Sequence, residues 1–296
     1  MPVFFSNKMV APASGGSPSA AKPSQVVNSW LRGGLPIEVI GPSPATLEEL
    51  SLAHDPGHVR AVLGGRKRNG FGNTMPEVAR SLPYTTGSML SAARHVLRTG
   101  GAACAPCSGF HHAGYAFCQG YCTFNGLAVT ALALRQAGLA RKVGILDCDM
   151  HEGDGTDAIL RRSACEEIEH WTAGKCFDDP SEVPLFFRWL EDALDAMAGC
   201  SVVLYQAGAD PHVNDPLGGW LTTDELRERD ARVFEGLRAR GVPVVWNLAG
   251  GYQVEPDGSI PRVLEIHKHT ALECLRVHSA AIRMPPEKSD GLPLAR

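Results

Sequence analysis

The segment VGILDCDMHEGDG, residues 143–155, decides the fold of this 296-residue chain. Its opening residues, Val143 to Leu146, form a short apolar run that is typical of a fully buried strand. Acidic and imidazole side chains follow at once, at the place where an open parallel sheet presents its ligand-binding loops. This order predicts an α/β sheet with its functional residues at the carboxyl ends of the strands.

Helix-like and strand-like segments alternate on both sides of this segment. Residues 126–139 carry apolar side chains at helical spacing and precede the strand. Residues 201–205 form a β-branched run, Thr222 and Glu225 form the capping box of a further helix, and residues 243–248 form another apolar strand. Strands separated by helices predict a parallel sheet flanked by helices on both faces.

Composition and charge narrow the classes of function. The chain has 28 basic and 32 acidic residues, a net charge of -4, and therefore lacks the basic footprint of a nucleic-acid-binding protein. No stretch approaches the roughly 18 uninterrupted apolar residues of a membrane helix, and the start of the chain lacks the apolar segment of a signal peptide. Nine irregularly spaced cysteines fit reduced thiols. We expect a cytoplasmic protein that binds neither nucleic acid nor membrane.

Reactive side chains follow four of the predicted strands, including an apolar run at residues 102–105. Because the carboxyl ends of parallel strands meet at one edge of a sheet, we expect these side chains to lie near one another. In chain order they are His111 and His112, then Asp147, Asp149, His151 and Asp154, then Asp210, and finally Tyr252.

Three of these residues form a predicted metal site. In an extended backbone Asp149 and His151 point to the same side, since strand side chains alternate with period two. Asp210 arrives from the next strand and completes a three-ligand set of nitrogen and oxygen, which leaves a position open as catalytic zinc sites do. A weaker alternative is a structural zinc site made by Cys104, Cys107, Cys118 and Cys122.

The two adjacent histidines predict proton-transfer roles. His111 and His112 cannot occupy equivalent environments, and each ring needs a carboxylate that sets its tautomer and pKa. Asp147 and Asp154 are the natural partners. Tyr252 follows two glycines and can place a hydroxyl where negative charge develops on a substrate oxygen.

These residues belong to motifs that together resemble the histone deacetylase superfamily. The motifs are, in chain order, His111-His112-Ala113, Gly120-Tyr121-Cys122-x-Phe124-Asn125, Asp147-x-Asp149-x-His151-x-Gly153-Asp154-Gly155-Thr156, Gln206-Ala207-Gly208-Ala209-Asp210-Pro211 with Asp215-Pro216-Leu217-Gly218, and Gly250-Gly251-Tyr252. The resemblance runs from about Leu47 to Cys274, leaving residues 1–46 poorly matched and residues 285–296 as a tail. It implies a single catalytic domain, residues 1–296, with the arginase-deacetylase fold.

The resemblance also implies an activity, a cofactor and a role for each residue. The implied enzyme is a zinc-dependent amidohydrolase, with Fe²⁺ as the alternative metal, that removes an acetyl or other acyl group from an acylated amine such as acetyl-lysine. A small acylated amine such as an acetylpolyamine is the alternative substrate. The implied roles are zinc ligation by Asp149, His151 and Asp210, base and acid catalysis by His111 and His112 oriented by Asp147 and Asp154, carbonyl binding by Tyr252, and substrate contact by Gly120 and Tyr121. Gly153 and, after Asp210, Pro211-His212 stand where binuclear relatives of this fold need further carboxylates, which favours one metal.

One region departs from the family pattern. The segment between Gly155 and Gln206 is short, and the usual strand and Phe-Pro-Gly-Thr-Gly loop are not found, with only residues 168–177 in their place. We expect Trp171 or Phe177 either to replace the missing aromatic wall of the substrate tunnel or to serve as a plain core residue. Potassium binding is not expected, because the missing segment contributes to that site. A homo-oligomer, in which a neighbouring subunit completes the rim, stays open.

A second class of function competes with the enzyme. The short rim is compatible with a catalytically impaired protein that keeps its metal and binds a ligand. The presence of His111, His112 and Tyr252 argues against this class, because loss of catalysis removes the need for these side chains.

Overall fold

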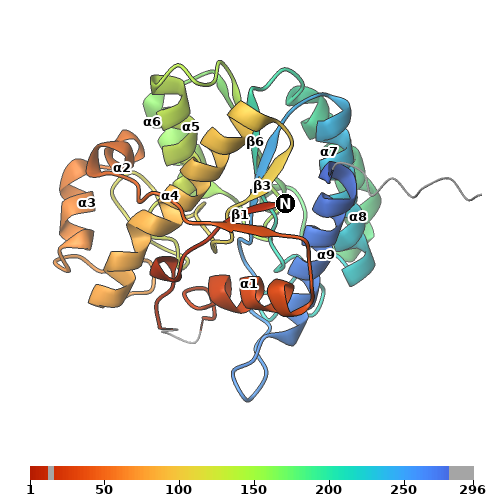
Figure 1. The fold of residues 1–296 in the computed structure, drawn as a ribbon, viewed down its shortest axis with the longest axis horizontal. Coiled ribbons are helices and arrows are strands. Elements are labelled where there is room, and N and C mark those ends of the chain that lie inside the picture. The colour runs from red at the N-terminus through yellow and green to blue at the C-terminus, as the bar shows by residue number, and fades with distance from the viewer. Residues whose placement is uncertain (13–16, 280–296) are drawn as a thin grey trace, which may run out of the picture.

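A seven-stranded parallel sheet organises the chain in the computed structural model, which describes residues 1–12 and 17–279 (Figure 1). The strand order is β2-β1-β3-β7-β6-β4-β5, and every neighbouring pair is parallel. The strands are β1 (Pro2–Phe4), β2 (Glu38–Ile40), β3 (Ala102–Cys104), β4 (Val143–Asp147), β5 (Ile168–Thr172), β6 (Val202–Gln206) and β7 (Val244–Asn247). The predicted α/β class with a parallel sheet is confirmed, and the predicted tail at 285–296 lies outside the described residues.

Helices cover both faces of this sheet. Figure 1 shows α2 to α6 on one side and α7 to α9 on the other, and α1 packs against α9. The helices are α1 (Lys22–Arg32), α2 (Leu47–Ala53), α3 (Pro56–Leu63), α4 (Pro76–Thr99), α5 (Gly126–Gln136), α6 (Asp154–Ser163), α7 (Val183–Ala196), α8 (Thr223–Ala239) and α9 (Pro261–His278). The predicted capping box opens α8: Thr222 Oγ1 accepts from Glu225 N, and Glu225 Oε2 accepts from Thr222 N.

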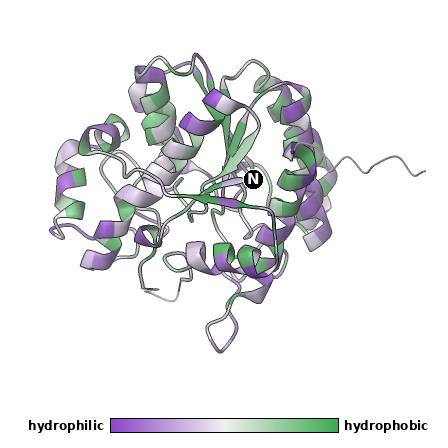
Figure 2. Ribbon diagram, in the orientation of Figure 1, coloured by the Kyte–Doolittle hydropathy of each residue, from purple (hydrophilic) through white to green (hydrophobic). Residues whose placement is uncertain are grey.

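The centre of the sheet forms the hydrophobic core. Every residue of β4 and β6 is buried, and the apolar faces of the helices turn toward these strands (Figure 2). The strands β3, β7, β6 and β4 lie side by side in this order. Their carboxyl ends are the four strand ends that carry the predicted site residues, so the topology brings those residues to one edge.

The family strand expected to be missing after Gly155 is present. Residues 168–172 form β5 and pair with β4 over its whole length, with Trp171 opposite Leu146 and Thr172 opposite Asp147. The expectation was wrong because β5 is an edge strand, where polar side chains are tolerated. Glu169 pairs with Lys142 at 3.1 Å. The short connection that follows contains two 3₁₀ turns, Ala173–Lys175 and Pro180–Glu182.

Neither of the two aromatic residues proposed for the tunnel wall reaches the site. The Trp171 ring lies 5.8 Å from that of Trp189, and the Phe177 ring lies 5.6 Å from that of Phe186. Phe177 and Phe186 pack against the buried Trp220, and Trp189 of α7 contacts both Trp171 and Phe177. Both residues therefore have the plain core role.

The first 46 residues build part of the same sheet. Strand β1 pairs with β2 on one side and with β3 on the other, and Val3 is fully buried. Among the described residues, no helix combines the length and the apolar character needed to cross a bilayer.

Candidate metal centre and active site

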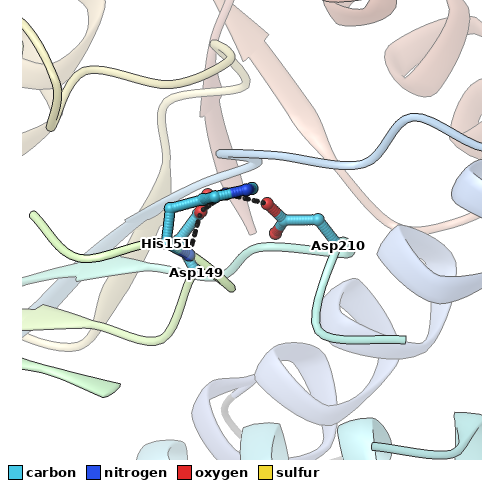
Figure 3. A group of neighbouring side chains, drawn as sticks. All are labelled: Asp149, His151 and Asp210. Atoms are coloured by element: carbon cyan, nitrogen blue, oxygen red, sulfur yellow. Dashed lines mark hydrogen bonds and ion pairs between the residues drawn. The ribbon is translucent and has the colours of Figure 1, made fainter. Parts of the chain in front are cut away.

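The predicted metal ligands meet at the ends of β4 and β6. His151 Nδ1 lies 3.2 Å from Asp149 Oδ1 and 3.2 Å from Asp210 Oδ2 (Figure 3). The two side chains from the β4 loop point together because of a turn, in which His151 N donates to Asp149 Oδ1 at 3.1 Å. This differs from the expected extended backbone, since β4 already ends at Asp147.

The chemistry of these three donors fits a divalent cation. Both carboxylates are buried, and Asp210 Oδ2 accepts no hydrogen bond of good geometry although His151 Nδ1 lies 3.2 Å away. Burial, with the charge of Asp149 added, raises the pKa of Asp210 to about 7. The hydrogen bond to Asp149 and the nearby carboxylate of Asp210 raise the pKa of His151 to about 10. The donor spacing is close to the edge of about 3.3 Å that a tetrahedral zinc site with bonds of about 2.0 Å requires.

Glycines make room for this convergence. A Cβ at residue 208 would lie 2.5 Å from Asp210 Oδ1, and one at residue 250 would lie 2.1 Å from Asp210 Oδ2. Within residues 1–12 and 17–279, Asp149, His151 and Asp210 are the one cluster of His, Cys, Asp or Glu that meets the geometry of a metal site. The alternative cysteine site is not assembled there.

The buried His111 ring lies between two carboxylates. Its Nδ1 lies 2.7 Å from Asp147 Oδ2, and its Nε2 lies 3.5 Å from Asp149 Oδ1. Asp147 is held in turn by Gln206 Nε2, which donates to Oδ1 at 3.0 Å. Burial disfavours the charged ring, but Asp147 and Asp149 outweigh it and raise the pKa of His111 to about 9. The two carboxylates therefore favour the protonated form of this imidazole.

His112 has the opposite electrostatic environment. Its Nδ1 lies 2.7 Å from Asp154 Oδ1, and its ring centroid lies 4.1 Å from that of His111. Burial and the neighbouring His111 lower the pKa of His112, which Asp154 only partly offsets. Gln119 Nε2 donates to Asp154 Oδ2 at 2.8 Å, a contact that sequence reasoning missed. The structure thus brings the two adjacent histidines together with their pKa values displaced in opposite directions.

The Tyr252 loop is held from several directions. Gly250 N donates to Asp149 Oδ2 at 2.8 Å, and Tyr252 N donates to Asp215 Oδ2 at 2.8 Å. Ala249 has a positive φ of 49°, a costly conformation for a residue with a Cβ. These bonds fix the tyrosine next to the metal ligands.

A buried lysine from α1 completes this support. Lys22 Nζ donates to Ala249 O at 2.6 Å and to Gly250 O at 3.1 Å, and the side chain has no exposed surface. Burial lowers the pKa of Lys22 to about 8, against the opposing charges of Asp210 and Asp149. Sequence reasoning missed this residue, because it lies in the poorly matched first 46 residues and no local signal marks it.

A neutral cavity adjoins Tyr252. Gly120 and Tyr121, for which substrate contact is predicted, line it, and Phe71 adds an aromatic ring that was not predicted. The Tyr121 ring lies 5.8 Å from both the Tyr252 and the Phe71 rings. Hydroxyl groups share the lining with these rings, namely those of Ser19, Ser81, Thr85, Ser108 and Thr123, and the described lining contains no charged side chain.

The glycine before this aromatic residue is required by its surroundings. Gly120 has a φ of 54°, and a Cβ there would lie 2.4 Å from His112 Cδ2. The site is not fully enclosed, since the Asp154 side chain is 44% exposed and that of His151 is 34% exposed.

The fold and this site define a class of protein, the α/β proteins of the arginase-deacetylase fold. The family model of the histone deacetylase domain matches residues 19–166 of this chain. This match begins upstream of Leu47, where the resemblance seen in the sequence begins. An acetylpolyamine aminohydrolase from Burkholderia pseudomallei superposes with a TM-score of 0.72 at 18% identity, covering 94% of this chain and 99% of that chain. The HDA15 HD domain superposes with a TM-score of 0.72 at 20% identity, covering 94% and 95%. These structures establish the fold.

The chain belongs to the histone deacetylase family. It is 30% identical over 241 residues to an uncharacterized protein of Picosynechococcus, covering 73% of this chain and 79% of that protein. It is 31% identical over 180 residues to acetylpolyamine amidohydrolase 1 of Pseudomonas aeruginosa, covering 50% of each. The chain thus spans only half of this second relative. By family it is a histone deacetylase-like amidohydrolase.

Proposed function

We propose that this protein is a metal-dependent deacetylase that hydrolyses the amide of an acylated amine and releases a carboxylate and the free amine. One observation carries the proposal. The Asp149, His151 and Asp210 triad lies beside two His–Asp pairs, His111 with Asp147 and His112 with Asp154, whose imidazole pKa values are displaced in opposite directions, and the Tyr252 loop is bonded to the same edge. Amide hydrolysis needs these functions together: activation of a carbonyl group, a proton acceptor and a proton donor.

The metal proposed for the triad is Zn²⁺, with Fe²⁺ as the alternative. Asp149, His151 and Asp210 would hold it, and a single ion is favoured because Gly153 and the Pro211-His212 pair supply no bridging carboxylate. When bound, the ion supplies Lewis-acid activation of the substrate carbonyl and of a water molecule.

The proton chemistry follows from the two histidines. His112 is neutral near pH 7, since burial and His111 lower its pKa, and can take a proton from the attacking water at Nε2. Its Nδ1 stays bonded to Asp154, which holds the ring in place. His111 is already cationic and stabilises negative charge beside Asp149, while the Tyr252 hydroxyl donates to the carbonyl oxygen as charge grows on it. The proton taken by His112 then passes to the departing amine.

Acylated amines are the proposed substrates, with acetyl-lysine and acetylpolyamines as the two candidates. The second candidate draws support from relatives named acetylpolyamine amidohydrolases.

A substrate screen tests the proposal. Protein reconstituted with Zn²⁺ is assayed on acetyl-lysine peptides and on acetylpolyamines, with Asp210→Ala as the blank. We expect turnover of at least one class, loss of turnover in the blank, and a fall of about 100-fold or more in kcat for Tyr252→Phe. Tyr84→Phe is the matched control, because Tyr84 lies on α4 with its hydroxyl near Lys8. Activity that survives Asp210→Ala would contradict the proposal.

The competing class, a metal-binding protein without turnover, predicts a different result. It predicts stoichiometric zinc and no hydrolysis of any acylated amine in the screen. The intact His111, His112 and Tyr252 contacts favour the enzyme. Hydrolysis that is abolished by Tyr252→Phe excludes this second class.

A further inference from the structure

A buried arginine contacts the two loops that carry Asp149 and Asp210. Arg229 on α8 has no exposed surface, and its pKa is raised further because the charge of Asp230 outweighs the cost of burial. The side chain therefore stays charged in the interior. An arginine is rarely buried in this way unless its donors are used.

One nitrogen of this side chain joins the two loops that carry the metal ligands. Arg229 Nη1 donates to Cys148 O at 3.2 Å and to Gly208 O at 2.8 Å. Cys148 immediately precedes Asp149, and Gly208 stands two residues before Asp210. The guanidinium thus connects the end of β4 to the end of β6.

The loops have little freedom at this point. A Cβ on Gly208 would lie 2.9 Å from the Asp149 backbone, so the two loops are in direct contact there. Met150 N also approaches Asp210 Oδ1, at 3.4 Å. A small rotation of either loop would change the distance between the two carboxylates.

The carboxylate of Asp230 anchors the guanidinium of Arg229. Arg229 Nε donates to Asp230 Oδ1 at 2.9 Å. Tyr205 Oη donates to Asp230 Oδ1, and Thr270 Oγ1 donates to Asp230 Oδ2. The carboxylate thus receives donors from β6 and α9, which fixes the guanidinium in one orientation.

We propose that Arg229 is a positioning residue that sets the spacing of Asp149 and Asp210 and thereby the affinity and geometry of the metal site. This inference rests on the proposed metal site. Mutation of the hydrogen-bonding groups that orient metal ligands typically lowers metal affinity by about 10- to 100-fold. A lysine keeps the charge, but its single ammonium group lacks the planar fork that serves two carbonyls and a carboxylate at once.

The test uses Arg229→Lys in the full chain, with Arg232→Lys as the matched control. Arg232 lies on the same helix, is partly exposed, and pairs with Glu228 rather than with the metal loops. We measure Zn²⁺ affinity by competition with a chromophoric chelator, and ligand geometry by the visible spectrum of the Co²⁺-substituted protein. Far-UV circular dichroism and thermal melting check that each variant is folded.

Folded Arg229→Lys should bind Zn²⁺ at least tenfold more weakly and show an altered Co²⁺ spectrum, whereas Arg232→Lys should match the wild type. Affinity within twofold of the wild type together with an unchanged spectrum would overturn the inference. If Arg229→Lys does not fold, Tyr205→Phe takes its place, because it frees one side of Asp230. At least threefold weaker Zn²⁺ binding is then expected, and unchanged binding overturns the inference.

The result is separable from the proposed function. Failure of the deacetylase proposal appears as activity in Asp210→Ala or as no turnover of any acylated amine. Failure of the Arg229 inference appears only in the metal affinity and the Co²⁺ spectrum, which do not depend on the substrate.

Discussion

Gly250→Ala tests how tightly the Tyr252 loop is packed against the metal ligands. The added Cβ would lie 2.1 Å from Asp210 Oδ2 and 2.3 Å from Asp210 Cγ. Non-bonded heavy atoms need roughly 3.5 Å, so the carboxylate or the loop must move by more than 1 Å. Movement of Asp210 loses a metal ligand, and movement of the loop breaks the bond from Gly250 N to Asp149 and displaces Tyr252.

A shift of about 1 Å at a reacting site costs about 100-fold in rate, and overpacking costs about 1–3 kcal/mol of stability. We therefore expect kcat/KM to fall at least 100-fold, Zn²⁺ affinity to fall at least tenfold, and the melting temperature to drop by several degrees. Deacetylation assays, chelator competition and thermal melting measure the three effects. Gly41→Ala is the control, because a Cβ there meets nothing within 4 Å. Turnover and zinc affinity within threefold of the wild type would refute the reasoning.

Three further predictions concern other parts of the molecule. In Gly120→Ala the new Cβ meets the His112 ring at 2.4 Å, so kcat should fall at least tenfold while Zn²⁺ affinity stays within twofold; equal losses in both would contradict a selective effect on His112. Burial lowers the pKa of His54 to about 4, and its neutral ring accepts from Asn125 N at 2.8 Å. As pH falls from about 6.5 to 4, His54 is protonated in the unfolded chain before it is protonated in the folded protein, so the free energy of unfolding should decrease by up to about 3 kcal/mol. Urea titrations at a series of pH values should show a shallower decrease for His54→Gln. The same dependence of unfolding free energy on pH in both proteins would contradict this assignment. Phe186→Ala opens a cavity in the cluster with Phe177 and Trp220, and urea unfolding should show a loss of about 3–5 kcal/mol; a loss under 1 kcal/mol would mean that the cluster collapses around the gap.

Local sequence patterns were enough for the fold class and for several strand and helix positions. The apolar run at 143–146 is a strand because all its residues are buried and it has a neighbouring strand on each side, β6 and β5. Strand β5 was missed for the opposite reason: at the edge of the sheet it keeps Glu169 and His170, so its sequence lacks the apolar signature. His170 Nδ1 lies 2.7 Å from Asp157 Oδ1, a partner that sequence alone does not show.

The metal ligands and the histidine pair could be named from the order of residues after each strand, since parallel strands end at a common edge and the chain order therefore limits which side chains can meet. The support behind them could not be named. Lys22 reaches the Tyr252 loop from a helix 227 residues away in sequence, and Arg229 spans the carbonyls of two loops from α8. Hydrogen bonds to backbone carbonyls leave no pattern in the sequence, because every residue offers the same carbonyl group. Which lysine or arginine finds such a carbonyl depends on how the helices pack on the sheet.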